Sequence, residues 1–430
     1  MEPFMQRRDF LRSVALGTGA VVSGTLSGCT RGLTIGRQVM GKPISRSEKP
    51  LAIAMWDTSW LLRHHKGGEF EDWDKVLDEL AGRGYNAIRI DALPHLVAAD
   101  PQGKIEEEFY FPRETWEPAL WGNYFSTHAR PREALMTFLP KCRQRGISVG
   151  LATWFTYDGS KRNDRIQGLD EFVRVWDETL TFLAENRLLD GVVYVDVLNE
   201  YPQSHGLHWL TKKLRTLANP PTSGPETGKP QTGPGGYNQV QRECYREFMT
   251  QTLKRLKNKW PAMDFFASLP ASPQAPWQQM DLTQFGALDV HMWFVFNDKL
   301  DQQVGYFKNF HKAKNDLGFE QCYAAIREYW QAHKHELVEW MEGKVQSVAQ
   351  VGKQYGIPYG NTEGWGPVRW LDHPALDWNW VKETGEIGAR LGAKHGYKFN
   401  CSSNFTHPQF RGLWADVAWH REITSIIRRV

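Results

Sequence analysis

Residues 83–90 read RGYNAIRI and contain the joint on which the fold prediction rests. The glycine at the second position suits the left-handed turn that ends a helix, and an apolar strand begins directly after it. The same joint recurs at residues 145–153 (RGISVGLAT), 355–362 (YGIPYGNT) and 395–402 (HGYKFNCS). Four such joints indicate repeated units in which a helix runs into a parallel strand.

The segments outside these joints carry the apolar periodicity of amphipathic helices. Apolar side chains recur at three- and four-residue spacing near residues 70–80 and again near 172–183, which places each set on one helical face. The two faces consist of Phe70, Trp73, Val76, Leu77 and Leu80, and of Phe172, Val175, Trp176, Leu180 and Leu183.

Eight short apolar segments alternate with helices along the rest of the chain. We expect strands at 52–56, 87–90, 148–153, 192–198, 264–269, 288–293, 358–362 and 398–402. This alternation predicts an α/β fold of the (β/α)8 TIM barrel type rather than an open doubly wound sheet. No GxGxxG or GxxxxGK[ST] motif follows a strand, which argues against the usual nucleotide-binding folds. The Pro- and Gly-rich stretch 219–236 is predicted to be an exposed loop near the barrel mouth, either bordering a cleft or inert.

Composition narrows the class of protein without deciding it. Apolar residues make up 41% and charged residues 23% of the 430 residues, which excludes a disordered chain or a fibrous rod. The net charge of +3 comes from charges spread along the chain, so we expect no nucleic-acid partner. The aromatic fraction of 13%, with 19 Trp, suits stacking on ligand faces as well as core packing.

The N-terminal residues read as an export address. Arg7 and Arg8 precede a short apolar stretch that is too short to span a bilayer, and the pair resembles a twin-arginine signal. Residues 26–29 (LSGC) resemble a bacterial lipobox, which implies lipidation of Cys29. We therefore expect a signal at 1–29, a linker at 30–48 and one domain at 49–430. The location would be periplasmic or anchored at the cell envelope, with membrane contact only through that lipid.

Four further cysteines are widely scattered: Cys142, Cys244, Cys322 and Cys401. None has CxxC spacing, so we expect no zinc cluster. Free thiols and disulfides both remain open for these residues, because four cysteines allow three pairings.

The strand ends point to the chemistry, because barrel enzymes place their active sites at the C-terminal ends of strands. The fourth expected strand ends in Asn199-Glu200, and the seventh continues into Glu363. These strands lie on opposite sides of an eight-stranded barrel, so the two carboxylates can face each other across its axis. Two carboxyl groups about 5–5.5 Å apart are what a retaining glycosidase requires.

These motifs resemble the signature of the large retaining glycoside hydrolase clan that includes the family-five cellulases. Arg89 on the second strand and His291 on the sixth fit the same pattern. The resemblance implies that Glu200 is the acid/base and Glu363 the nucleophile, with Asn199 bonding the sugar 2-hydroxyl. It also implies that Arg89 keeps Glu363 ionised, while burial and neighbouring charge raise the pKa of Glu200.

The chain departs from that pattern in its aromatic residues. Trp154 follows the third strand where many cellulases carry His, Trp293 replaces a frequent Tyr, and the eighth strand lacks the usual Trp. We predict that Trp56, Trp154, Trp293 and Trp365 contact the sugar instead.

The prediction is thus a retaining hydrolase that cleaves a β-linked glycan or glycoside by double displacement between two glutamates. Its partner would be an oligo- or polysaccharide, and no metal or other cofactor is expected. One alternative is a non-catalytic sugar-binding protein on a cellulase-like barrel. A barrel enzyme of other chemistry, such as an isomerase, is a further alternative, but the sequence has no phosphate-binding loop or metal-ligand motif for it.

Overall fold

The computed structural model describes residues 42–429 except 56, 113–125, 203–205, 219–235, 272–275, 307–315, 371 and 375. The predicted signal with Cys29, the side chain of Trp56 and nearly all of the Pro- and Gly-rich loop lie outside the described residues. Within the described part, no helix is both long and apolar enough to cross a bilayer.

Parallel strands form a closed ring, which confirms the (β/α)8 barrel. The chain of pairings runs β9-β10-β12-β1-β2-β5-β6-β7, and β8, which continues β7, pairs with β9 and closes the ring. The ring strands are β1 (Leu51–Ala54), β2 (Ala87–Asp91), β5 (Ser148–Ala152), β6 (Val192–Asp196), β7 (Phe265–Phe266), β8 (Leu269–Pro270), β9 (Leu288–Trp293), β10 (Tyr359–Asn361), β11 (Gly364–Trp365) and β12 (Phe399–Cys401). All eight predicted strand positions are therefore confirmed, with ends that move by up to two residues.

Two of the ring positions are interrupted, and the interruptions have the same cause. The backbone N–H of Ser268, between β7 and β8, donates to Asp196 Oδ1 at 2.9 Å. The N–H of Thr362, between β10 and β11, donates to Asp289 Oδ1 at 2.9 Å. Each aspartate on a neighbouring strand thus takes a bond that the sheet would otherwise use, and the backbone next to Glu363 is released from regular pairing.

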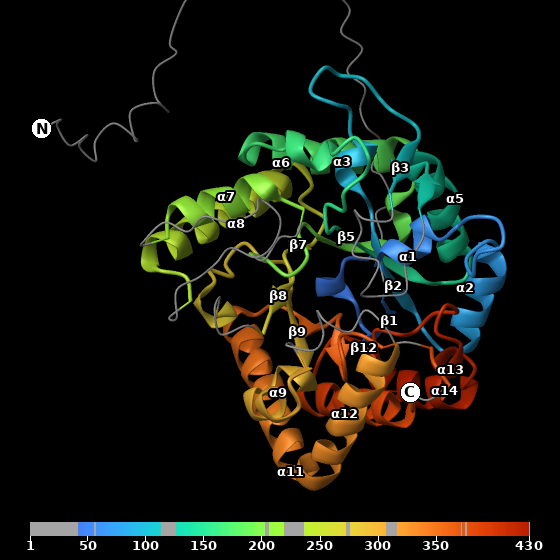
Figure 1. The fold of residues 1–430 in the computed structure, drawn as a ribbon. Helices are drawn as coiled ribbons and strands as arrows, with labels where there is room; N and C mark the ends of the chain where they lie inside the picture. Colours follow the sequence, from blue (N-terminus) through green and yellow to red (C-terminus); the bar gives the residue numbers. More distant parts are fainter. Residues whose placement is uncertain are drawn as a thin grey trace, which may run out of the picture. The chain divides into compact units, whose positions relative to one another are not determined.

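Helices surround the outside of the strands (Figure 1). They are α1 (Asp57–Leu62), α2 (Trp73–Gly82), α3 (Pro94–Val97), α5 (Pro131–Gln144), α6 (Leu169–Glu185), α7 (His208–Thr216), α8 (Gln239–Lys259), α9 (Asp298–Val304), α11 (Asp316–Tyr355), α12 (Asn379–His395), α13 (Arg411–Trp414) and α14 (Val417–Arg428). Both predicted apolar faces are buried, one on α2 and its preceding turn and one on α6. An antiparallel hairpin of β3 (Phe109–Phe111) and β4 (Thr127–Ala129) is an addition that the sequence did not predict.

The predicted joints have the expected backbone geometry. Gly84, Gly146, Gly356 and Gly396 all adopt left-handed φ values, between 67° and 87°. Because this region is strained for residues with a Cβ, glycine lets each helix end and the next strand begin at once.

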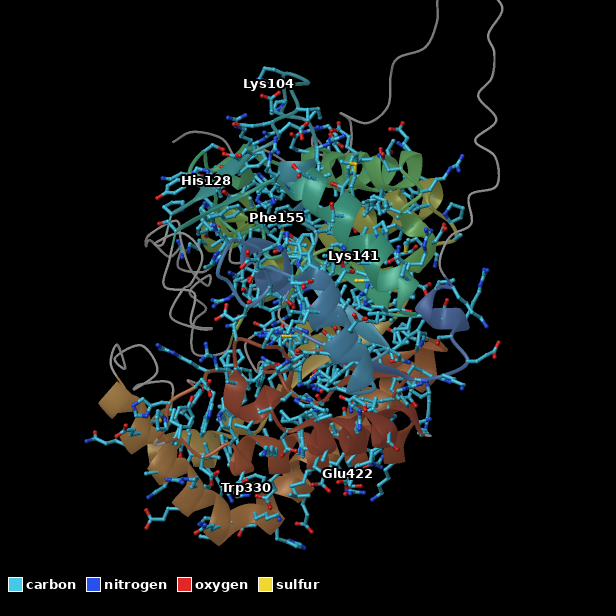
Figure 2. All side chains as sticks on the ribbon, turned by 90° about the vertical axis from the view of Figure 1, so that its right-hand side faces the viewer. Lys104, His128, Lys141, Phe155, Trp330 and Glu422 are labelled. Atoms are coloured by element: carbon cyan, nitrogen blue, oxygen red, sulfur yellow. The ribbon has the colours of Figure 1, made fainter. Side chains whose placement is uncertain are left out.

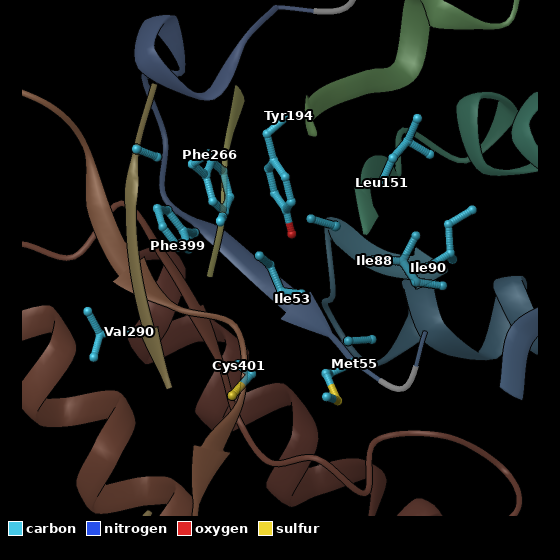
Figure 3. Close-up of a cluster of buried hydrophobic side chains, with 14 of the residues drawn as sticks. Ile53, Met55, Ile88, Ile90, Leu151, Tyr194, Phe266, Val290, Phe399 and Cys401 are labelled. Atoms are coloured by element: carbon cyan, nitrogen blue, oxygen red, sulfur yellow. The ribbon is translucent and has the colours of Figure 1, made fainter. Parts of the chain in front are cut away.

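Aromatic side chains fill the lower part of the barrel interior. The ring of Tyr194 lies 5.0 Å from that of Phe266, and Phe266 stacks on Phe399 at 6.4 Å, as Figure 3 shows. A Cβ on Gly150 would come within 2.0 Å of the Tyr194 ring, so this glycine makes room for it. This part of the barrel is thus a packed core, and the polar side chains of the candidate site lie at the C-terminal ends of the strands.

Candidate active site

Two glutamates from distant parts of the chain converge at the C-terminal ends of the strands. Glu200 follows β6, and Glu363 lies between β10 and β11. One carboxylate oxygen from each and one ring nitrogen of His291 all lie within 4.8 Å of one another. The Glu363 side chain is 3% exposed and that of Glu200 is 13% exposed, so Glu200 is the one nearer to solvent.

The backbone holds Glu200 in an unusual conformation. Its φ is 50°, in the left-handed region that residues with side chains rarely adopt. Its N–H donates to Ser268 Oγ at 3.0 Å, which ties the turn to the interrupted fifth barrel strand. Backbone strain of this kind is found most often at functional sites.

Arg89 of β2 places a positive charge against two carboxylates of the cluster, those of Glu363 and Asp196. Its guanidinium donates to Glu363 Oε1 at 2.8 Å and to Asp196 Oδ2 at 3.0 Å, and it also donates to the side-chain oxygen of Asn199. Arg89 is fully buried. Burial raises the pKa of the Asp196 carboxyl, the nearby Asp289 charge raises it further, and Arg89 opposes both effects.

The bond from Arg89 fixes the orientation of the Asn199 amide. Because its oxygen faces the guanidinium, its NH2 group points elsewhere, and the Asn199 Nδ2 atom is buried with no hydrogen-bond partner among the described residues. An unpaired buried donor is costly, so one beside two carboxylates is a ready binding point for a ligand oxygen.

His291 of β9 lies between the two glutamates. Its Nδ1 is 3.3 Å from Glu200 Oε1 and 3.5 Å from Glu363 Oε2. Its Nε2 is 3.2 Å from Thr362 Oγ1 and 3.6 Å from Asp289 Oδ2. Burial would lower the pKa of the imidazole, but the Glu363 and Asp289 charges outweigh it and raise the pKa to about 10. At neutral pH the ring is therefore an imidazolium with two N–H donors.

The charge balance of this cluster is acidic. Four carboxyl groups, those of Asp196, Glu200, Asp289 and Glu363, surround the two cations Arg89 and His291. Excess negative charge favours retention of a proton within the group. Glu200, His291 and Glu363 each place one ligand atom within 4.8 Å of the others, a spacing that would also admit a metal ion.

The structure brings five predicted residues together: Arg89, Asn199, Glu200, His291 and Glu363. It adds Asp196, Asp289, Thr362 and Ser268, which the sequence analysis did not select. Asp196 and Asp289 carried a usable signal, because each is a lone charge within an apolar strand and must find a partner when buried.

The predicted aromatic contacts have different outcomes. Trp154 is half-buried just beyond β5, and its backbone N–H donates to Asp91 Oδ2 at 3.0 Å. Trp293 is 1% exposed, and its indole N–H has no partner within the described part of the chain. Trp365 instead donates to the Cys401 carbonyl at 3.0 Å and packs against Gly388 of α12. Its ring is fully buried beside α12, and the sugar contact predicted for it stays a prediction.

The four described cysteines are free thiols: Cys142, Cys244, Cys322 and Cys401. Burial raises the pKa of the Cys142 and Cys401 thiols, so both stay protonated and unreactive.

Comparison with known proteins assigns the chain to a family. Residues 53–428 match the sequence model of a family described as sugar-binding cellulase-like. The chain belongs to this cellulase-like family. A crystal structure of a candidate glycoside hydrolase from Parabacteroides distasonis superposes with a TM-score of 0.75 and 29% identity, covering 88% of this chain and 93% of that one.

Two more distant structures also align with this cellulase-like chain. An endo-β-1,4-mannanase from Thermotoga petrophila matches with a TM-score of 0.46 and 9% identity over 90% of this chain and 78% of its own. An endocellulase from Pyrococcus horikoshii matches with a TM-score of 0.43 and 12% identity over 87% and 92%. No curated protein matches the chain by sequence.

Proposed function

We propose that the chain is a retaining glycoside hydrolase that cleaves a β-linked glycan or glycoside, with Glu363 as nucleophile and Glu200 as acid/base. The observation that carries the proposal is the approach of the two carboxylates to within 4.8 Å. Double displacement uses carboxyl groups about 5–5.5 Å apart, whereas an inverting enzyme needs about 6.5–9.5 Å to admit a water between them.

In the first step, a Glu363 carboxylate oxygen attacks the anomeric carbon while Glu200 donates its proton to the departing glycosidic oxygen. The bond from the anomeric carbon to that oxygen breaks, and a glycosyl ester forms on Glu363. Arg89 holds Oε1 of Glu363 at 2.8 Å, which leaves Oε2 as the attacking atom. The Asn199 NH2 group is free to donate to the sugar 2-hydroxyl, a contact that strengthens in the transition state.

In the second step, Glu200 takes a proton from water, and the resulting hydroxide attacks the anomeric carbon and displaces Glu363. Two inversions give net retention, and both glutamates return to their starting states. The imidazolium of His291 balances the negative charge that moves between them, because its Nδ1 lies within 3.5 Å of an oxygen of each.

The test is the hydrolysis of a panel of aryl glycosides by wild type, Glu363→Gln and Glu200→Gln. Glu386→Gln is the control, because this glutamate is partly exposed on α12 and pairs with Arg390. We expect Glu363→Gln to lose roughly a thousandfold or more in kcat, and the control to lose nothing. Proton NMR of the first product should show the β-anomer. Equal cleavage of any substrate by wild type and Glu363→Gln contradicts the nucleophile assignment.

A second candidate function is sugar binding without turnover. Its support is the description of the family as sugar-binding, together with the full burial of Trp365, whose indole N–H donates to the Cys401 carbonyl. Calorimetric binding of an oligosaccharide that stays intact over days with wild type would favour this function over hydrolysis.

We also propose that the protein is exported and held at the cell envelope through a lipid on Cys29. Fractionation of cells that express the full chain tests this. We expect wild type in the membrane fraction and Cys29→Ala in the soluble fraction, and identical distributions would contradict the anchor.

A further inference from the structure

A cavity lies between the start of α9 and α11. It has a volume of about 270 Å³ and shares no lining residue with the candidate active site. The lining residues that bear on its chemistry are Asn297, Asp298, Tyr329, Glu336, Leu337 and Trp340. We call this cavity the α9–α11 groove.

The groove follows one face of α11. Tyr329, Glu336 and Trp340 are spaced by seven and four residues, so they form a stripe over about three helical turns. A neighbouring face anchors the helix, because Trp330, labelled in Figure 2, is buried against Phe294 at 5.0 Å and donates to Glu383 at 2.8 Å. The stripe therefore stands on a fixed support.

Aromatic rings mark the two ends of the stripe. Tyr329 and Trp340 are half-buried, and Leu337, at 2% exposed, forms an apolar floor between them. Each ring has one face covered: the Lys344 ammonium lies 4.9 Å from the centre of the Trp340 ring, and the His333 ring stacks on Tyr329 with centroids 4.4 Å apart. The opposite faces are the ones that a ligand could contact. Flat rings beside an apolar floor suit the C–H faces of a ligand that is also rich in polar groups.

The polar groups of the groove carry both signs. Asp298 and Glu336 offer carboxylate oxygens, and Lys299 offers an ammonium. The Asn297 side-chain oxygen accepts from Leu300 N at 3.1 Å as a helix cap, so its NH2 group is left to donate. His333 also lines the groove, with its Nδ1 3.8 Å from Glu336 Oε1, so the charges of the lining nearly balance. Acceptors and donors side by side suit hydroxyl groups, which do both.

We propose that the α9–α11 groove is a second carbohydrate-binding site, which holds a neutral segment of the polysaccharide whose cleavage is proposed above. A ligand this rich in hydroxyl groups matches the paired rings and the mixed polar lining. The groove lies near the active site, because Asn297 follows His291 by six residues, a span of at most about 22 Å of extended chain. A polysaccharide held in the groove is therefore kept close to the carboxylates.

The test separates binding from cleavage. Affinity gel electrophoresis with barley β-glucan, glucomannan and xylan measures binding to Glu363→Gln, to Glu363→Gln with Trp340→Ala, and to Glu363→Gln with Tyr329→Ala. The control adds Tyr355→Ala, an exposed aromatic at the end of the same helix and outside the groove. Thermal melts check that each variant is folded. Trp340→Phe is tested as well, because it keeps a flat ring and serves if Trp340→Ala is too unstable to be measured.

At least one polysaccharide should retard Glu363→Gln and the Tyr355 control equally. Trp340→Ala and Tyr329→Ala should weaken that binding by about tenfold, and Trp340→Phe should restore most of it. In the active background, Trp340→Ala should cleave a small aryl glycoside at the wild-type rate and the polysaccharide more slowly. If no polysaccharide retards Glu363→Gln, or if all variants are retarded equally, the α9–α11 groove is not a carbohydrate-binding site. Groove-dependent binding without any hydrolysis supports the groove and contradicts the proposed function instead.

Discussion

Replacing Arg89 with methionine should destabilise the protein by removing the buried cation beneath the two glutamates. Methionine has a similar reach but carries no charge. The change leaves Glu363 and Asp196 without the guanidinium that now lies 2.8 Å and 3.0 Å from their oxygens. Both side chains are almost completely buried, and breaking a buried ion pair costs about 3–5 kcal/mol of unfolding free energy.

The loss should depend on pH, and its sign follows from the carboxyl groups. Burial already raises the pKa of Asp196, and loss of the nearby positive charge raises it further. The folded variant then holds a proton that the unfolded chain releases above pH of about 4. Stability of Arg89→Met should therefore fall as pH rises from about 4 through the raised folded-state pKa.

Urea unfolding followed by tryptophan fluorescence measures this at about pH 5 and about pH 8. Arg390→Met is the matched control, since Arg390 pairs with Glu386 on the exposed side of α12. An exposed pair of this kind contributes less than about 1 kcal/mol. If Arg89→Met loses no more stability than Arg390→Met, or the same amount at both pH values, the guanidinium does not neutralise the cluster and our account is wrong.

Three further predictions concern His291, Asn199 and the packing behind Trp365. The pKa of His291 is raised to about 10, so the stabilising charge of its ring is fully present below pH of about 6.5 and is lost as pH rises through 10. The unfolding free energy of wild type should therefore fall between these pH values, whereas that of His291→Asn should not. Asn199→Ala should slow cleavage of an aryl glycoside by roughly 10–100-fold but leave its 2-deoxy analogue unchanged, and equal effects on both would contradict the 2-hydroxyl contact. Gly388→Ala places a Cβ within 2.4 Å of three Trp365 ring atoms and should lower the thermal midpoint. Gly343→Ala, whose Cβ meets nothing within 4 Å, should keep or raise it, and similar shifts in calorimetry would refute this packing.

The barrel could be predicted because its signals are local. Each joint glycine needs a left-handed φ, and each strand needs a short apolar run, so both are visible in a few consecutive residues. The division of the fifth strand around Ser268 could not be predicted, because its cause is an acceptor on Asp196, in another strand. The same holds for the hairpin of β3 and β4, whose second strand follows a long separation in sequence.

The candidate site was predictable where its residues stand at strand ends, and Arg89 and His291, which lie within strands, were predicted from the family resemblance. Asn199, Glu200 and Glu363 follow apolar runs, so their position at the barrel mouth could be inferred. Asp289 lies within a strand, and its role depends on its contacts with His291 and Thr362, which only the folded barrel creates. The packing of the Trp365 ring against α12 could not be predicted either, because it depends on the missing side chain of Gly388, which is close only in the folded barrel.

The pairing of β1 with β12 has a consequence for the chain during its synthesis. Leu51 of the first barrel strand is matched with Phe399 of the last one, which the ribosome makes only after all the other barrel strands. Throughout synthesis, the strand made first therefore keeps one side of its backbone unsatisfied, and so does whichever strand was made most recently. Such open edges invite association between growing chains. A chain truncated before residue 399 should consequently aggregate rather than fold into a smaller functional domain.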